Sequence, residues 1–349
     1  MNCSWAGLAL AFILSAVSAT GDTVDNYLLS QMREHKIPGA ALIVLQTNQP
    51  VKRAAYGVAN LEWNIPATPE TVFEIGSVTK QFTASCVLLL VQDGKLTLDD
   101  KIGLYLKNTP ESWAAIRIRH LLTHTSGLKS YTGLDGFELR RHLTQAQFIE
   151  QMGRQPLEFS PGENWKYCNT GFNLLGFIIE NVSGSSYCDF LARRILIPLG
   201  MNATTNRDPA RIIPNRAAGY EQTNHIWINR DYDLTDVFSA GALVSTIDDL
   251  AKWNRSLDEA TLLKPEILQQ AWTPSRLNNG EATRYGFGWR IETFEGHSNI
   301  GHAGATSGFS ASIQRFPDEH LAVILLTNTD EQIATTLARG IAQFYLPAR

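Results

Sequence analysis

The sequence predicts a protein of the α/β class, of α+β type, in which an antiparallel sheet flanked by helices is built from both ends of the chain and carries a helical lobe. Apolar runs of strand length gather near the two ends of the chain. Between them, about residues 77–194 show helical periodicity broken by Gly and Pro loops. The 349 residues are 44% hydrophobic and 18% charged, which suffices for one large core or two lobes.

The N-terminal part of the folded chain is expected to contribute one helix and two strands. Residues 24–35 have helical spacing, and Pro38-Gly39 ends the segment. The short apolar run 40–46 then reads as a strand, and 51–58 resembles a second one. This end therefore has the order helix, turn, strand, strand.

Two apolar helices are expected in the middle of the chain. Residues 77–91 form a nearly continuous apolar segment that stops at Asp93-Gly94, with glycine placed just past the helix end. A second apolar helix is expected at 172–182, after a loop rich in Gly, Pro and Asn. The first of these helices should be buried, because it is apolar nearly all round.

The C-terminal end supplies further strands and a closing helix. Strands are expected at 286–292, 309–316 and 321–327, the last being strongly apolar. Residues 331–346 have the pattern of an amphipathic helix. A sheet fed by both ends leaves a cleft against the helical lobe, and such clefts commonly bind ligands.

These elements divide the chain into a leader and one catalytic domain with two lobes. The expected bounds are a signal peptide at 1–19 and a domain at 20–349, made of an α/β lobe at about 20–76 and 240–349 and a helical lobe at about 77–239. No internal repeat or low-complexity tract suggests independent domains joined by a linker.

The first 19 residues have the features of a secretory signal. They contain no charged side chain, they carry an apolar stretch at 6–14, and they end in the small-residue pattern Val17-Ser18-Ala19. The positive charge before the stretch comes from the α-amino group alone, where Lys or Arg is usual. A bilayer core needs roughly 20 apolar residues, and no later segment reaches that length free of charge. We therefore expect a periplasmic or secreted protein without a stable membrane span.

The charge of the chain argues against nucleic-acid binding, and its cysteine content argues against a disulfide framework. The net charge of -4 and the absence of Lys/Arg blocks offer no footprint for phosphates, so nucleic-acid binding is not expected. Removal of the leader leaves Cys86, Cys168 and Cys188, an odd number that does not indicate a disulfide framework. Cys86 reads as a small core residue, whereas Cys168 reads as either packing or a reactive thiol.

The first chemical motif is a serine followed three residues later by a lysine. Ser77 is expected in the first turn of its helix, where free N–H groups and the helix dipole favour negative charge. Lys80 projects from the same face, and burial would make its amine a feasible base. Alone, the pair could equally be an N-cap serine and a surface lysine. Ser126 and Lys129 repeat this spacing, but Gly127 marks that segment as a turn.

The second motif stands at the mouth of the helix expected at 172–182. Tyr167 beside a cationic lysine would be pushed toward phenolate and could pass protons between the serine and a leaving group. Asn169 could hold the lysine and a substrate carbonyl together. The alternative for Tyr167 is an ordinary amphipathic surface aromatic.

The third motif lies between two expected strands and has edge-strand character. Gly304 would let a ligand approach the backbone, and the Ala305 and Ser77 N–H groups could form an oxyanion hole. His302, with an ordinary pKa near 6.5, could bind a substrate carboxylate, and that binding should weaken as pH rises. Alone, the segment could be a hairpin turn with a chance histidine.

In this order, the three motifs resemble those of the serine hydrolases related to penicillin-binding proteins and class C β-lactamases. The resemblance runs over nearly all of the mature chain and includes His124-Thr125-Ser126-Gly127-Leu128, Gly241-Ala242-Leu243-Val244-Ser245 and Tyr285-Gly286-Phe287-Gly288-Trp289. It implies a nucleophile at Ser77, a proton network of Lys80 and Tyr167, an orienting role for Asn169, and no metal or other cofactor.

Two departures from the family pattern narrow the expected function. His302 stands where β-lactamases of this class have lysine, and Cys168 stands where Ser or Ala is more common. In the family, histidine at the first of these positions is found more among peptidases, D-amino-acid-releasing enzymes and esterase-like members. The resemblance therefore implies a D-amino-acid peptidase or esterase-like hydrolase of a small molecule or peptide. A true class C-type β-lactamase and an acylated penicillin-binding sensor without turnover remain alternatives, and the oligomeric state stays open.

Two other chemistries lack their sequence patterns. No Gly-x-Ser-x-Gly occurs, so the nucleophile elbow of α/β-hydrolases is missing. His120 and His124 are one helical turn apart, but no His-Glu-x-x-His places a glutamate between them, so a metal site is not expected.

Overall fold

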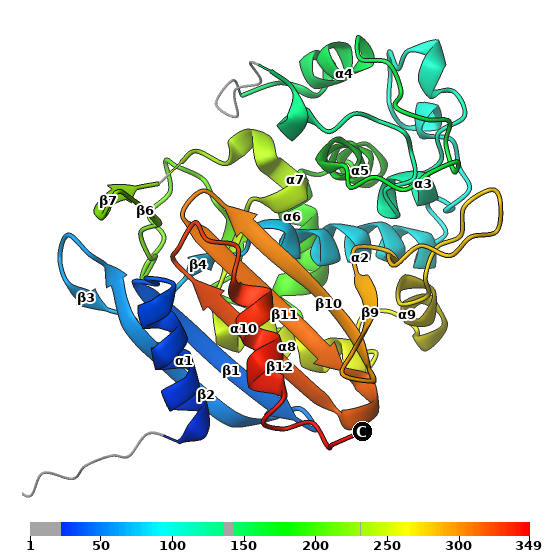
Figure 1. The fold of residues 1–349 in the computed structure, drawn as a ribbon. Coiled ribbons are helices and arrows are strands. Elements are labelled where there is room, and N and C mark those ends of the chain that lie inside the picture. Colours follow the sequence, from blue (N-terminus) through cyan, green and yellow to red (C-terminus); the bar gives the residue numbers. More distant parts are fainter. Residues whose placement is uncertain (1–21, 136–141, 231) are drawn as a thin grey trace, which may run out of the picture.

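The computed structural model describes residues 22–135, 142–230 and 232–349 (Figure 1). The expected signal peptide at 1–19 lies outside the described residues. The strands are β1 (Gly39–Gln46), β2 (Gln49–Asn60), β3 (Ile65–Pro66), β4 (Phe73–Glu74), β5 (Thr205–Asn206), β6 (Tyr220–Thr223), β7 (Ile226–Asn229), β8 (Leu243–Ser245), β9 (Arg290–Phe294), β10 (His297–Thr306), β11 (Phe309–Phe316) and β12 (Leu321–Thr327). The helices are α1 (Thr23–Glu34), α2 (Thr79–Gln92), α3 (Ile118–Leu122), α4 (Gln145–Gly153), α5 (Asn169–Ser183), α6 (Tyr187–Leu191), α7 (Phe238–Gly241), α8 (Ile247–Asp258), α9 (Pro265–Ala271) and α10 (Ala334–Ala342), and a 3₁₀ turn, η1 (Gly76–Val78), precedes α2.

Strands from the two ends of the chain meet in one seven-stranded sheet. Its order is β3-β2-β1-β12-β11-β10-β9, and every neighbouring pair is antiparallel. The two ends join where β1 pairs with β12, with Leu42 opposite Leu325. The predicted fold class, an antiparallel sheet built from both ends and flanked by helices, is confirmed.

The central strands are apolar on both faces because both faces of the sheet are covered. Even-numbered β1 residues such as Leu42 and Val44 pack with α1 and α10, whereas Ile43 and Leu45 belong to the core on the other side. This alternation follows from the two-residue period of a strand. It explains why β1 and β12 read as continuous hydrophobic runs rather than alternating ones.

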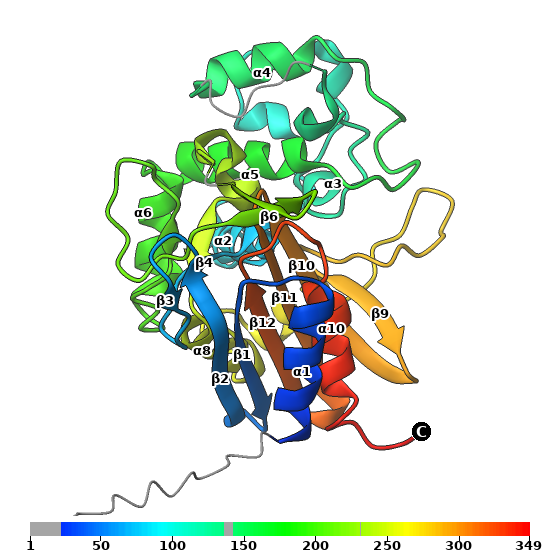
Figure 2. The same cartoon turned by 60° about the vertical axis from the view of Figure 1, so that its left-hand side comes forward.

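The helices form layers around the sheet. In Figures 1 and 2, α1 and α10 lie together on one face, and α8 lies on the opposite one, against β1 and β12. The helix α2 runs between the sheet and the remaining helices and contacts α5 and α7. Its residues from Thr79 to Leu90 are all buried, which agrees with its lack of a polar face. It ends as expected, with Gly94 at a φ of 67° just beyond it.

Two expected elements at the C-terminal end have different bounds. The strand expected at 286–292 begins only at Arg290, because Gly288 takes a φ of 78° and leaves the extended conformation. A Cβ on Gly288 would lie 2.7 Å from the Lys80 carbonyl oxygen, so this glycine turn packs directly on α2. The helix expected at 331–346 is shorter and spans Ala334–Ala342.

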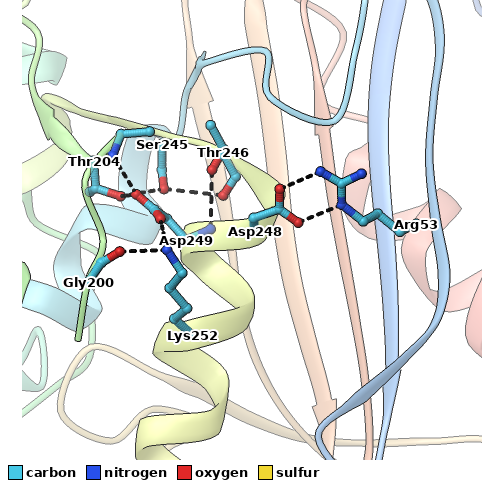
Figure 3. Close-up of polar contacts among 9 residues, drawn as sticks. Arg53, Gly200, Thr204, Ser245, Thr246, Asp248, Asp249 and Lys252 are labelled. Carbon is cyan, nitrogen blue, oxygen red and sulfur yellow. Dashed lines mark hydrogen bonds and ion pairs between the residues drawn. The ribbon is translucent and has the colours of Figure 1, made fainter.

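A polar network fixes the start of α8 (Figure 3). The buried Asp249 carboxylate accepts from the Ala203 N–H (2.8 Å) and the Thr204 hydroxyl (3.0 Å), and it pairs with Lys252 at 2.9 Å. Next to it, Asp248 takes a two-pronged ion pair from Arg53, at 2.8 and 2.7 Å. Asp248, Asp249 and Lys252 border a cavity of about 680 Å³, which we call the α8 cavity. Within the described residues, no helix is long and apolar enough to cross a bilayer.

Candidate active site

Two glycines let the turn before α2 touch strand β10. A Cβ on Gly304 would lie 1.9 Å from the Ile75 carbonyl oxygen and 3.3 Å from the Ser77 nitrogen. Gly76 has a φ of 48°, and a Cβ there would lie 2.6 Å from the Ala305 nitrogen. Any side chain at either position would push the two backbones apart. The close approach brings the Ser77 and Ala305 N–H groups to one place, as an oxyanion hole requires.

Lys80 is fully buried and makes three polar contacts. Its Nζ lies 2.7 Å from Asn169 Oδ1, 2.7 Å from the Ala240 carbonyl oxygen and 3.1 Å from Ser77 Oγ. No carboxylate is among these partners, so burial is uncompensated by an opposite charge. Burial lowers the pKa of the Lys80 amine well below its usual range.

Tyr167 lies on the other side of the serine. Its phenol hydrogen bonds with the Ser77 hydroxyl, and its ring centroid is 4.9 Å from the Lys80 nitrogen. Burial raises the pKa of Tyr167 above that of a free phenol, and the contact with Ser77 offsets only part of this effect. The ring is therefore a neutral phenol at physiological pH, contrary to the expectation that Lys80 pushes it toward phenolate.

Asn169 is the first residue of α5 and is oriented by hydrogen bonds at both ends of its amide. Its Oδ1 accepts from Lys80, and its Nδ2 donates to the Thr132 hydroxyl at 3.3 Å. The Asn169 backbone N–H donates to Ser130 Oγ at 3.1 Å. These contacts fix which end of the amide faces the lysine.

His302 is buried and locked by two hydrogen bonds. Its Nδ1 lies 2.6 Å from the Ala303 carbonyl oxygen, which can only accept, so Nδ1 carries the proton. Its Nε2 therefore accepts from the Tyr285 hydroxyl at 2.7 Å. Burial, with the nearby Lys80, lowers the pKa of His302 to about 3. The expectation that His302 titrates near 6.5 and carries positive charge for a substrate carboxylate is thus corrected.

The half of β10 that faces the site has a free edge. The pairing with β9 stops at Gly301 opposite Arg290, so residues 302–306 are paired only with β11. The whole strand is internal in the sheet, but this half has the edge character expected from its glycines. Ala303 and Ala305 are exposed there, beside a cavity of about 530 Å³ that Ser77 also lines.

Arg290 is a site residue that the motifs did not single out. It lines the same cavity as Ser77, Tyr167 and His302, and its guanidinium has no hydrogen-bond or ion-pair partner among the described residues. In contrast, Arg339 on the same wall is paired with Glu292 and bonded to Asn299 at 2.7 Å. Arg290 directly follows the Tyr285–Trp289 motif, and this position could have drawn attention to it. Only the sheet register, however, places it beside the cavity.

The cysteine beside the site is a packing residue. Cys168 is buried at the start of α5, and burial raises its pKa to about 11, so its thiol stays protonated. The three described cysteines, Cys86, Cys168 and Cys188, are all free. Across residues 22–135, 142–230 and 232–349, no group of three or more His, Cys, Asp or Glu side chains could hold a metal ion.

Similarity to known proteins agrees with this geometry. The profile of the Beta-lactamase family matches residues 24–346. The chain is 32% identical over 303 residues to penicillin-binding protein 4* of Bacillus subtilis, covering 79% of this chain and 65% of that protein. It is 28% identical over 329 residues to D-aminopeptidase of Gluconobacter oxydans, covering 89% and 60%. The chain thus spans about three-fifths of the length of these curated relatives.

Solved structures show the same fold. The octameric penicillin-binding protein homologue from Pyrococcus abyssi superposes with a TM-score of 0.80 at 28% identity, over 92% of this chain and 76% of that one. D-amino acid amidase from Ochrobactrum anthropi SV3 superposes with a TM-score of 0.80 at 23% identity, over 92% and 98%, and this likeness concerns the fold alone. With the profile match over nearly the whole chain, these findings place the chain in the Beta-lactamase family of serine hydrolases.

Proposed function

We propose that the protein hydrolyses amide, lactam or ester bonds through an acyl-enzyme formed on Ser77. The observation that carries the proposal is the set of contacts around the Lys80 nitrogen. A neutral amine has two N–H groups and one lone pair, and Asn169 Oδ1 and the Ala240 carbonyl oxygen can only accept. They take both N–H groups, which leaves the lone pair for the Ser77 hydroxyl at 3.1 Å.

In this scheme, Lys80 is the resting base of the acylation step. Burial without a counter-charge lowers the pKa of its amine and so favours the neutral form, which can accept the Ser77 proton as Oγ attacks the carbonyl carbon. The Ser77 and Ala305 N–H groups then stabilise the negative charge on the carbonyl oxygen. Tyr167, as a neutral phenol within reach of Ser77, passes a proton to the leaving group and recovers one from Lys80.

The charge of the cavity favours an acyl donor with an anionic group. Arg290 lies on the cavity wall with no partner for its guanidinium among the described residues, and His302 is neutral, so a substrate carboxylate would bind to the guanidinium. The relative named D-aminopeptidase supports a D-amino-acid peptidase or esterase-like activity. A class C-type β-lactamase is the second candidate, because the same anionic recognition suits a β-lactam.

The test is a purified-enzyme panel of nitrocefin, p-nitrophenyl esters, D-alanyl peptides and D-amino-acid amides, each with wild type and Ser77→Ala. We expect at least one substrate to be turned over, and Ser77→Ala to lower its kcat by about 10³-fold or more. Wild-type rates in Ser77→Ala would show that another residue forms the intermediate. The substrate with the highest kcat/KM decides between peptidase, esterase and β-lactamase.

An acylated sensor without turnover makes a different prediction from a hydrolase. A fluorescent penicillin would label Ser77 in both cases, but a sensor would release no product beyond one equivalent of enzyme. Sustained product release beyond the first equivalent, measured under excess substrate, excludes the sensor.

We further propose that the protein acts outside the cytoplasm, supported by the apolar stretch and small-residue pattern before residue 20. Expression of the full chain in a Gram-negative host should yield a processed protein in the periplasmic fraction. N-terminal sequencing that finds residues 1–19 intact in the cytoplasmic fraction would contradict this.

A further inference from the structure

His124, which the catalytic scheme does not use, lies buried beside the segment that carries Tyr167. It follows α3, is buried, and takes a φ of 61°, in the left-handed region that few residues other than glycine adopt. Its loop packs on the loop before α5, because Thr125 O accepts from the Gly162 N–H at 2.8 Å. A strained backbone in a buried polar residue beside a catalytic group calls for a specific role.

The backbone N–H groups of the two residues next to Tyr167 in the chain are both bonded to this one residue. The Lys166 N–H donates to the His124 carbonyl oxygen at 3.0 Å, and the Cys168 N–H donates to His124 Nδ1 at 3.1 Å. Between these two bonds, the imidazole ring lies against the Tyr167 ring, with centroids 4.3 Å apart and a tilt of 44°. His124 therefore restricts the movement of both the backbone around Tyr167 and the Tyr167 ring.

The hydrogen bonds also fix the protonation of the imidazole. Since the Cys168 N–H donates to Nδ1, the neutral ring carries its proton on Nε2. Nε2 is buried without a hydrogen-bond partner among the described residues, next to the rings of Phe172 and Tyr285. An unpaired buried N–H is costly, so packing alone would favour an apolar residue here.

Two other roles for His124 do not fit these contacts. A metal site is not formed, since the described residues contain no cluster of ligating side chains. A general base would need a free lone pair, but the lone pair on Nδ1 is taken by Cys168 and Nε2 carries the proton.

We propose that His124 is a positioning residue that holds the Tyr167 phenol against Ser77. The Nδ1 acceptor and the carbonyl of His124 clamp the backbone on either side of Tyr167, and the ring sets the angle of the phenol. This proposal rests on the proposed function, because the position of Tyr167 affects the rate only if its phenol moves a proton at Ser77.

The test compares two substitutions that both tolerate the left-handed backbone. In His124→Asn, Oδ1 occupies the place of Nδ1 and keeps the acceptor for Cys168, whereas His124→Gly removes acceptor and ring. For p-nitrophenyl ester hydrolysis, we expect His124→Gly to lower kcat by about 10²-fold with KM within about threefold, since misplacement of a reacting group has this size of effect. We expect His124→Asn to stay within about tenfold of wild type.

The matched control is His120→Asn, one helical turn earlier. His120 also accepts a backbone N–H on Nδ1, from Arg117 at 3.2 Å, but among the described residues it makes no hydrogen bond to the Tyr167 segment. We expect wild-type kcat in this variant. A loss as large as that of His124→Gly would assign the effect to the local fold and overturn the proposal.

A double-mutant cycle separates positioning from a merely structural role. In the Tyr167→Phe background, His124→Gly should lower kcat no further, because there is no phenol left to position. Additive losses would overturn the proposal, as would His124→Gly with wild-type kcat. If His124→Gly does not fold, the kcat loss of His124→Asn is compared with and without the Tyr167 hydroxyl, and a loss that persists in Tyr167→Phe overturns the proposal. The Ser77→Ala variant tests the proposed function separately. Wild-type rates in Ser77→Ala would contradict the proposed function and would say nothing about the positioning role of His124.

Discussion

Two polar cavities, the α8 cavity and the cavity beside Ser77, differ in how their charges are compensated. In the α8 cavity, Asp249 is paired with Lys252 and bonded to the Thr204 segment, and Asp248 is paired with Arg53 (Figure 3). In the cavity beside Ser77, Lys80 has no anionic partner and Arg290 has no partner among the described residues. Compensated charges hold elements together, whereas uncompensated ones are left for a substrate or a proton transfer.

The largest expected difference between the two cavities concerns Lys80. Lys80→Met replaces a buried amine by an apolar side chain of similar length, so the fold should persist while the base is lost. We expect kcat/KM for a p-nitrophenyl ester to fall by about 10³-fold. Stopped assays with purified protein, together with a circular dichroism melt, check both parts. Activity within tenfold of wild type would show that the amine is not the base.

The second prediction concerns Asp249 and stability rather than activity. Asp249→Ala leaves the Ala203 N–H and the Thr204 hydroxyl without their acceptor, and we expect the free energy of unfolding to fall by about 3 kcal/mol. The matched variant Lys252→Met removes a half-exposed partner and should cost less than about 1 kcal/mol. Urea titrations measure both values, and kcat of the folded protein should be unchanged. A large loss of kcat at full folding would mean that the α8 cavity also serves the reaction.

The third prediction concerns Arg290, a cation in the cavity beside Ser77 whose guanidinium has no partner among the described residues. Arg290→Gln should raise KM about tenfold for a substrate with a carboxylate and leave KM for a neutral ester unchanged, because a charge-assisted hydrogen bond is lost only with the anionic substrate. Paired substrates that differ only in a carboxylate against its amide provide the measurement. An equal rise of KM for both members of the pair would assign Arg290 to packing.

The smallest expected effect is that of pH on KM. The pKa of His302 is lowered to about 3, so its imidazole is neutral above about pH 4 and changes charge nowhere between pH 5 and 8. KM for a carboxylate substrate should stay within about twofold over that range. If His302 titrated near its ordinary value and bound the carboxylate, KM would instead rise as pH increases through 6.5. That rise would overturn the neutral assignment.

The sequence predicted the elements whose pattern is local. The strands β11 and β12 were expected at 309–316 and 321–327 and have those bounds, because long apolar runs between turns have few other solutions. The start of β9 was predicted four residues too early. Gly288 takes a left-handed conformation because it packs against the Lys80 carbonyl oxygen, which is far away in the chain. Long-range packing overrode local propensity there.

In the candidate site, too, local sequence patterns identified the residues but not what depends on long-range packing. Its residue types could be identified from three short motifs, and the structure brings Ser77, Lys80 and Tyr167 within hydrogen-bonding reach, though their roles stay predictions. Their protonation could not be foreseen, because the charge of His302 depends on burial and on a hydrogen bond from Tyr285. The contacts of His124 with the Tyr167 segment could not be predicted for a similar reason, since they join residues 44 positions apart in the chain.

The pairing of β1 with β12 has a consequence for how the protein matures. The sheet cannot close until the last strands have been synthesised, because β1 has β12 as one of its two neighbours. Such distant pairing slows folding and leaves early strands without partners for longer. Ser77 precedes β10 in the chain by more than two hundred residues, so a chain that has not yet reached β10 carries the proposed nucleophile but lacks the Ala305 N–H. The proposed hydrolytic competence would therefore arise only after β10 and β12 have been synthesised.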